Sequence, residues 1–301
     1  MSAFPLRPVA FGDELSLTDH LSELRTRLFV CVAALVVLFG GCLWQSRALL
    51  TVLDRPLASI DTPTPAQAPL RTALDRSARA FSALSHAQTL NPTDRRAVVV
   101  AAQSLSSATR SLGERKPITI GLGEPFSTSV TVAFAFALML ASPLLLWQLW
   151  AFIAPAVAPE DRRAVRPLLA LAPALLIGGV VFAYELVLPP AVRFLQGFNS
   201  GAFDALVQAK DYYHFELLTM LALGAIFQLP VVMLVLGRAG LLSAQTLRTQ
   251  RRYAIVGLAA LAAALPGTDP VTTMLEIVPL IGLYELSIVL LRISERRRYG
   301  S

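Results

Sequence analysis

The chain has few charged residues for its length. Asp, Glu, Lys and Arg make up 15% of its 301 residues, whereas soluble domains carry about 25%. Apolar residues account for 55% of the chain, and its mean hydropathy is +0.60. This composition excludes an ordinary soluble globular domain and predicts an all-α polytopic membrane protein.

Cysteine and histidine are also scarce. The only cysteines, Cys31 and Cys42, lie in one apolar run, where a helix would hold them about 16 Å apart, too far for a disulfide. The three histidines, His20, His86 and His214, are far from one another in the sequence. The sequence therefore predicts neither a disulfide nor a metal site.

Motifs of enzymes and of cleaved leaders are missing. Gly121-Leu-Gly123 lacks the Lys-Ser/Thr ending of a phosphate loop, and no catalytic triad or catalytic acid pair is evident. Residues 1–27 carry four acids against three arginines, and no small-x-small cleavage site follows the first apolar run. We expect a non-enzyme without a cofactor, whose first apolar run is retained as a membrane span.

Six apolar runs predict six membrane spans. The second run is too long for one crossing, and its prolines and tryptophans predict a helix over about 126–149 that leaves the bilayer through an aromatic belt. The fifth run has only 16 residues, about 24 Å of helix against a hydrocarbon core of about 30 Å. The uncharged runs cover 28–46, 125–159, 167–184, 217–237, 253–268 and 277–284, the last continuing past Glu285 to Leu291.

The positive charges of the short loops and termini indicate the orientation. With both termini in the cytoplasm, fourteen arginines lie on the cytoplasmic side, against only Arg193 and Lys210 in the opposing short loops. This asymmetry predicts an N-in, C-in topology and explains the net charge of +6 without nucleic-acid binding. The fourteen are Arg7, Arg25, Arg27, Arg162, Arg163, Arg166, Arg238, Arg248, Arg251, Arg252, Arg292, Arg296, Arg297 and Arg298.

Residues 61–116, in the first outer loop, are rich in Ala, Ser and Arg and differ from the rest of the single membrane domain 1–301. Two helical stripes separated by Asn91-Pro92 predict a helical hairpin outside the membrane. We interpret it as a structural insert, with a partner-docking element as the alternative. The stripes are Leu70, Leu74, Phe81 and Leu84, then Val98, Ala101, Leu105 and Leu112.

Two acidic positions flank the predicted cytoplasmic face. Glu23 shares a helical face with His20 and Arg27 just ahead of the first span; the segment could equally be an interfacial anchor. Glu160 and Asp161 precede Arg162-Arg163, with which they could instead form an ion pair. Because carboxylates bind guanidinium groups bidentately, this acidic group would fit a basic, arginine-bearing peptide.

Five motifs, in order along the chain, give it a family resemblance. It resembles the TatC family, the six-span receptor subunit of the twin-arginine translocase, over nearly everything outside 61–116. The motifs are His20-Leu-Ser-Glu-Leu-Arg-Thr-Arg27, Trp147-Gln-Leu-Trp-Ala-Phe-Ile-Ala-Pro155 with Asp161-Arg-Arg163, Phe182-Ala-Tyr184 with Pro189, Phe227-Gln-Leu-Pro230, and Pro266-Gly-Thr-Asp-Pro270.

The resemblance implies a site for the paired arginines of a signal peptide. Glu23 and the acid at 161 would bind the arginines, and Arg25 and Phe152 would shape the surface. The family usually has Glu before the Arg-Arg pair, whereas this chain has Asp161 with Glu160 beside it. We favour Asp161 by register, and Glu160 stays the alternative.

The resemblance also implies partners and a location. Gln228 replaces a glutamate of many relatives and would contact single-span TatA/TatB-type subunits, unless it is satisfied within the bundle. A homo-oligomer within a complex, in the bacterial cytoplasmic (inner) membrane, is expected. Six further positions match the family and are interpreted as structural: Pro56, Pro125, Phe126, Pro155, Tyr184 and Asp269.

The main alternative is a proton-coupled small-molecule transporter that uses Glu276, Glu285 and Gln228. Transporters place such polar groups near midspan in two related halves, and no inverted repeat is evident here. A membrane scaffold that acts through its outer hairpin is a third reading.

Overall fold

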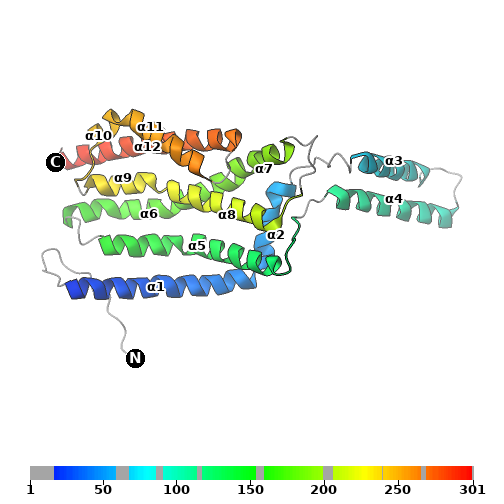
Figure 1. Ribbon diagram of the computed structural model, residues 1–301, viewed down its shortest axis with the longest axis horizontal. Coiled ribbons are helices and arrows are strands. Elements are labelled where there is room, and N and C mark those ends of the chain that lie inside the picture. The colour runs from blue at the N-terminus through cyan, green and yellow to red at the C-terminus, as the bar shows by residue number, and fades with distance from the viewer. Residues whose placement is uncertain are drawn as a thin grey trace, which may run out of the picture.

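The structure is a bundle of long helices with a helical hairpin projecting from one end (Figure 1). The computed structural model describes residues 17–58, 68–85, 91–113, 117–153, 159–198, 206–238, 240–265 and 269–299, without the side chains of 17–20, 58, 68, 110–113, 153, 159–170 and 297–299. Its elements are α1 Leu17–Trp44, α2 Ser46–Ala58, α3 Ala68–Ser85, α4 Pro92–Gly113, α5 Glu124–Ile153, α6 Pro159–Phe182, η2 Ala183–Val187, α7 Leu188–Gly197, α8 Ala209–Ile226, α9 Leu229–Arg238, α10 Ala244–Thr249, α11 Arg251–Ala264 and α12 Pro270–Tyr299.

Within the described residues, five helical segments are long and apolar enough to cross a membrane, so the chain is an all-helical polytopic membrane protein. They are Leu21–Trp44, Glu124–Phe152, Leu171–Gly197, Ala209–Arg238 and Pro270–Arg296. The fifth predicted span corresponds to α11, which has 14 residues and is too short to count among them. Helix α5 runs to Ile153 rather than ending near 149, because Trp147 and Trp150 continue the helix.

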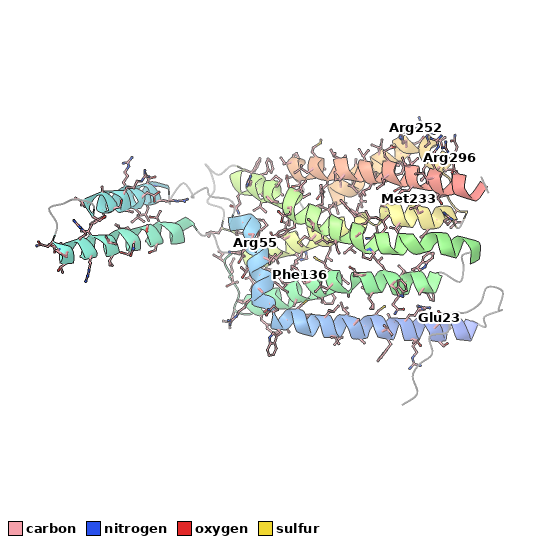
Figure 2. All side chains as sticks on the ribbon, turned by 180° about the vertical axis from the view of Figure 1, so that it is seen from behind. Glu23, Arg55, Phe136, Met233, Arg252 and Arg296 are labelled. Atoms are coloured by element: carbon pink, nitrogen blue, oxygen red, sulfur yellow. The ribbon has the colours of Figure 1, made fainter. Side chains whose placement is uncertain are left out.

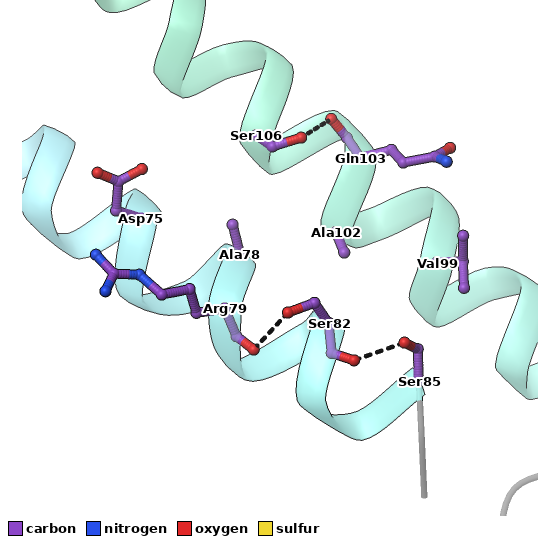
Figure 3. A pocket seen from close by; sticks show the side chains of 9 residues that line it. All are labelled: Asp75, Ala78, Arg79, Ser82, Ser85, Val99, Ala102, Gln103 and Ser106. Atoms are coloured by element: carbon purple, nitrogen blue, oxygen red, sulfur yellow. Dashed lines mark hydrogen bonds between the residues drawn. The ribbon is translucent and has the colours of Figure 1, made fainter.

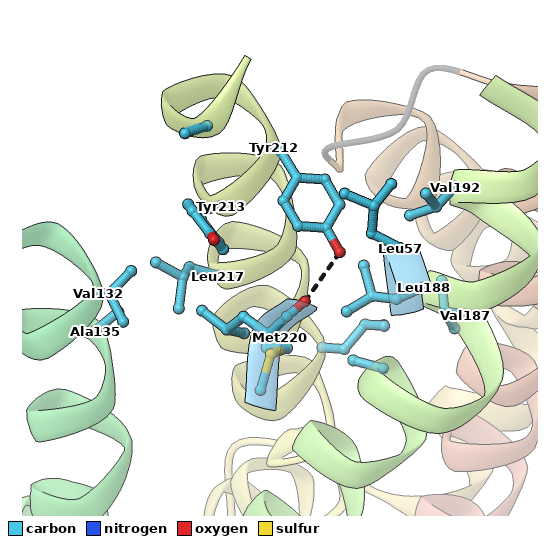
Figure 4. Close-up of a cluster of buried hydrophobic side chains, with 14 of the residues drawn as sticks. Leu57, Val132, Ala135, Val187, Leu188, Val192, Tyr212, Tyr213, Leu217 and Met220 are labelled. Atoms are coloured by element: carbon cyan, nitrogen blue, oxygen red, sulfur yellow. Dashed lines mark hydrogen bonds between the residues drawn. The ribbon is translucent and has the colours of Figure 1, made fainter. Parts of the chain in front are cut away.

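The bundle core lies between α2, α5, α8 and the π-helical turn η2 with α7 (Figure 4). Leu53 and Leu57 of α2 are fully buried there against Val132, Leu188 and Leu217. Helix α2 runs across the end of the bundle (Figures 1 and 2), so its apolar face closes that end of the core.

Two smaller clusters join further helices to the bundle. Leu234, Leu258 and Leu291 join α9, α11 and α12, while Cys42 packs on Ala133 and Ala137 to join α1 to α5. Much of α1 is otherwise uncovered, and Phe29 and Trp44 are among its exposed side chains. An uncovered apolar helix surface is expected where lipid surrounds the protein.

Helices α3 and α4 pack against each other beyond the bundle end (Figure 1). Their facing surfaces form a groove of about 480 Å³ lined by small and polar side chains such as Ala78, Ser82 and Ala102 (Figure 3). The predicted stripe of α3 does not fill this interface, because Leu70, Phe81 and Leu84 are exposed. Small side chains let two helices approach more closely than leucines would, which accounts for the difference.

Candidate functional site

Positive charge gathers at the end of the bundle opposite the hairpin. The start of α1, the end of α5, the start of α6, α10 and the end of α12 all lie at this end (Figure 1). Glu23, Arg252 and Arg296 are seen there, whereas Arg55 of α2 lies at the other end (Figure 2). We call this end the basic end.

Glu23 lies in the first turns of α1, paired with an arginine one turn later. The Arg27 Nε donates to Glu23 Oε1 at 2.9 Å, and Arg27 Nη2 contacts the same oxygen. The i, i+4 spacing brings the two side chains together on the helix surface. Both are largely covered by neighbouring groups, with exposed fractions of 20% for Glu23 and 18% for Arg27.

Arg27 also joins α1 to α5. Its Nη1 donates to the Gln148 Oε1 at 3.2 Å. Arg27, expected as a simple headgroup anchor, is thus held by two side chains of the protein itself. Arg25 is exposed, as an anchoring residue would be.

The second carboxylate oxygen of Glu23 differs from the first. Oε2 is buried and has no hydrogen-bond partner among the described residues. A buried carboxylate oxygen without a partner carries a desolvation penalty that a bound cation would relieve. Glu23 Oε2 is therefore an unsatisfied acceptor at the basic end to which a cationic ligand could bind.

The other predicted peptide-binding residues are partly outside the described structure. Phe152 is half-buried in the last turn of α5. The backbone of Glu160 and Asp161 forms the first turn of α6, but their side chains lie outside the described residues, as does Pro155. Whether either acid lies beside Glu23 stays a prediction.

Gln228 lies at the break between α8 and α9. It is buried, and its Nε2 donates to the carbonyl of Ala172 on α6 at 2.9 Å. Its Oε1 is buried without a hydrogen-bond partner among the described residues. Half of the amide is therefore used inside the bundle, and the predicted contact with a partner subunit stays a prediction.

The positions interpreted as structural take up packing, bonding or helix-end roles. Pro56 is buried within α2, and the Tyr184 hydroxyl donates to the carbonyl of Val52 at 2.6 Å. Asp269 caps α12 by accepting from the backbone N–H of Thr272 at 2.8 Å. Pro125 and the exposed Phe126 stand in the first turn of α5.

Sequence reasoning overlooked Glu124, which organises the end of the bundle from which the hairpin projects. Its Oε2 accepts from the backbone N–H groups of Ile120 and Gly121, at 2.8 and 3.1 Å. Its Oε1 accepts from the backbone N–H of Lys210 and from Gln208 Nε2, at 3.1 and 3.2 Å. An acid directly before Pro125 at a helix start is a capping signal that could have revealed it.

Helices α8 and α12 each carry a buried carboxyl group. Glu216 is fully buried, and its Oε1 lies 2.6 Å from the Tyr212 hydroxyl oxygen. Glu276 is fully buried as well, and neither of its oxygens has a partner among the described residues. Glu285, the second acid of the transporter alternative, pairs instead with Arg251.

Known proteins are similar to this chain in both sequence and fold. The model of the family described as Sec-independent protein translocase protein (TatC) matches residues 19–279. The TatC protein of Magnetococcus marinus is 31% identical over 282 residues, covering 94% of this chain and 86% of the relative. That of Deinococcus radiodurans is 37% identical over 182 residues, covering 60% of this chain and 67% of the relative.

A chloroplast relative and a solved structure extend the comparison. The chloroplastic TATC of rice is 29% identical over 90% of this chain, which spans 61% of that protein's length. A crystal structure described as the twin arginine translocase receptor TatC in DDM superposes with a TM-score of 0.66 at 27% identity, covering 90% of this chain and 99% of that one. The resemblance seen in the sequence motifs is confirmed, and the transporter alternative is set aside. The chain belongs to the TatC family, the receptor subunits of the twin-arginine translocase, which act in protein export without enzymatic chemistry of their own.

Proposed function

We propose that this chain binds the paired arginines of twin-arginine signal peptides at its basic end, with Glu23 as the principal ligand. One observation carries the proposal: Glu23 Oε2 is buried and unpartnered among the described residues. A guanidinium group offers parallel N–H donors that match the two oxygens of a carboxylate. The peptide's arginine therefore supplies what Glu23 lacks.

Asp161, or Glu160 beside it, would hold the second arginine. Both acids belong to the first turn of α6, which follows α5 closely in the chain, and α5 packs along α1. A carboxylate in the first turn of a helix is stabilised by the helix dipole. Phe152 at the end of α5 and Arg25 on α1 would border the bound peptide.

Six membrane crossings fit the helix directions better than five. Helix α9 ends at the basic end, and α12 begins at the opposite end and returns to it (Figure 1). Helix α11 must connect these two ends, and its 14 residues span about 21 Å. With the basic end facing the cytoplasm, both termini would be inside, and the bacterial inner membrane is the natural location.

Partner subunits would pack on the short fifth crossing, α11. A helix shorter than the hydrocarbon core thins the bilayer or recruits neighbouring helices. Single-span TatA/TatB-type subunits are the partners that fit, with the buried Gln228 side chain as a contact if α6 and α9 separate. A homo-oligomer within the complex is expected, and residues 61–116 would form a separate extracytoplasmic unit.

Peptide binding in nanodiscs tests the site. The probe is a fluorescent signal peptide with Arg-Arg, compared with the same peptide carrying Lys-Lys. We expect Glu23→Gln and Asp161→Asn to weaken Arg-Arg binding at least tenfold, because each leaves a guanidinium without its charged partner. Glu160→Gln is measured beside Asp161→Asn, and the variant that weakens Arg-Arg binding more identifies the acid that binds the second arginine.

A matched control is Glu295→Gln, which removes an acid of α12 at the same end. Glu295 accepts from the backbone N–H of Ala244 at 2.9 Å and is not part of the proposed site. The peptide affinity of the Glu295→Gln variant should stay within twofold of the affinity of the unmodified chain. Equal binding of the Arg-Arg and Lys-Lys peptides, unaffected by Glu23→Gln, would falsify the proposal.

A further inference from the structure

The carboxylate assigned to the peptide already has a guanidinium ligand of its own. Arg27 Nε and Nη2 both contact Glu23 Oε1, and neither forms a hydrogen bond with Oε2. A fork in which two nitrogens meet two oxygens is the strong form of this pair. Arg27 therefore uses only one of the two carboxylate oxygens of Glu23. An arginine of the peptide that contacted both oxygens would bind Glu23 more tightly.

Arg27 has a second acceptor if Glu23 is taken from it. Its Nη1 already donates to Gln148 Oε1 at 3.2 Å. A largely buried guanidinium with no acceptor would be costly, and Gln148 lowers that cost. The displaced side chain would thus stay attached to α5.

We propose that Arg27 is an internal competitor for the signal-peptide arginine, and that Gln148 retains Arg27 when the peptide displaces it from Glu23. The inference rests on the proposed function of Glu23. It adds a residue of this chain that sets peptide affinity without serving as a ligand of the peptide.

Competition of this kind has a defined signature. When only a fraction of the protein is open for binding, the apparent Kd is the intrinsic Kd divided by that fraction. The same fraction applies to every peptide that needs Glu23. Removing Arg27 should therefore strengthen Arg-Arg and Lys-Lys binding by the same factor and leave their ratio unchanged.

The first test is the affinity of Arg27→Gln for both fluorescent peptides in nanodiscs. We expect a rise of about two- to fivefold, which corresponds to the upper part of the range for a partly exposed ion pair. Arg292→Gln is the matched control, because it removes the same charge from an exposed position of α12 at the basic end. Its affinity should not change, which separates local competition from general repulsion.

The second test is a cycle with Gln148→Leu. In the unmodified background this change should weaken peptide binding two- to fivefold, because the displaced Arg27 loses its acceptor. In the Arg27→Gln background it should have no effect. A Gln148 that touched the peptide directly would weaken binding in both backgrounds, and that result overturns its role as an acceptor for Arg27.

The outcomes separate this inference from the function on which it rests. If Glu23→Gln abolishes binding while Arg27→Gln weakens it or leaves it unchanged, Arg27 positions Glu23 and the competition is wrong. If Glu23→Gln has no effect, the proposed function itself fails. Should Arg27→Gln not fold, Arg27→Lys keeps the charge but loses the second nitrogen contact, and absence of any rise in its affinity overturns the competition.

Discussion

Tyr213 and Asp54 are 159 residues apart in the sequence, and the Tyr213 hydroxyl donates a 2.7 Å hydrogen bond to the Asp54 Oδ1. Two further tyrosine hydroxyls reach backbone carbonyls of α2: Tyr212 donates to Leu53 at 2.9 Å, and Tyr184 donates to Val52 at 2.6 Å. Three consecutive residues of α2 are thus tied to α8 and η2, which holds α2 across the end of the bundle.

Tyr213→Phe should lower stability by about 1.5–3 kcal/mol, the usual contribution of a hydrogen bond to a charged group. The ring stays in place, so packing is kept and the loss reports the hydroxyl alone. Thermal unfolding in detergent, followed by size exclusion, measures the change. Tyr253→Phe removes an exposed hydroxyl from α11 and should stay within about 0.5 kcal/mol; equal losses for both variants would contradict the prediction.

Glu124→Ala should cost about 2–3 kcal/mol, because three backbone N–H groups and one side-chain amide lose their acceptor together. Glu124→Gln keeps one acceptor oxygen and should lose about half as much. The control is Glu185→Gln, which changes an exposed acid in η2. The same unfolding assay measures both variants, and an unchanged stability of Glu124→Ala would show that the hairpin end of the bundle does not depend on this carboxylate.

Two adjacent glycines of α6 offer a matched pair. A Cβ on Gly179 would lie 2.8 Å from the carbonyl oxygen of Leu223 and 2.9 Å from the Cα of Gly224, whereas a Cβ on Gly178 would meet nothing within 4 Å. Backbone cannot yield as a side chain can, so Gly179→Ala should destabilise the α6–α8 contact by about 1–3 kcal/mol. Gly178→Ala should be neutral or slightly stabilising, because alanine favours a helix. A lower melting temperature for Gly178→Ala than for Gly179→Ala would contradict the prediction.

Apolar runs predicted most spans because lipid imposes the same requirement along each crossing helix. Helix α4 begins at Pro92, as the Asn91-Pro92 signal predicted. The predicted boundaries of spans were wrong where a charged residue was assumed to end the helix. Helix α8 begins at Ala209, well before the uncharged run that starts at 217, because its Glu216 is buried against Tyr212.

The sequence predicted which types of residue form the Glu23 site, but it predicted only part of their contacts. The spacing put Glu23 and Arg27 on one face of a helix, but the partner on α5, Gln148, depends on how α1 packs and no local pattern reveals it. The same holds for Glu124, one of whose donors, the backbone N–H of Lys210 at the start of α8, lies 86 residues away in the sequence. Tertiary partners of a polar side chain cannot be read from periodicity, since periodicity reports only which face is buried.

Deleting residues 61–116 should leave peptide affinity within twofold. Helices α3 and α4 lie beyond the end of the bundle that is opposite Glu23 (Figures 1 and 2), and α2 is fixed to the bundle independently of them by its tyrosine bonds. A Gly/Ser bridge of about 12 residues, spanning roughly 20 Å, would connect α2 to Ile118, whose backbone N–H donates to the Val207 carbonyl at 2.8 Å. The unfolding assay first establishes that the shortened chain is folded. Loss of Arg-Arg peptide binding by that folded chain would mean that the hairpin and the Glu23 site are coupled across the membrane, or that they share one side of it.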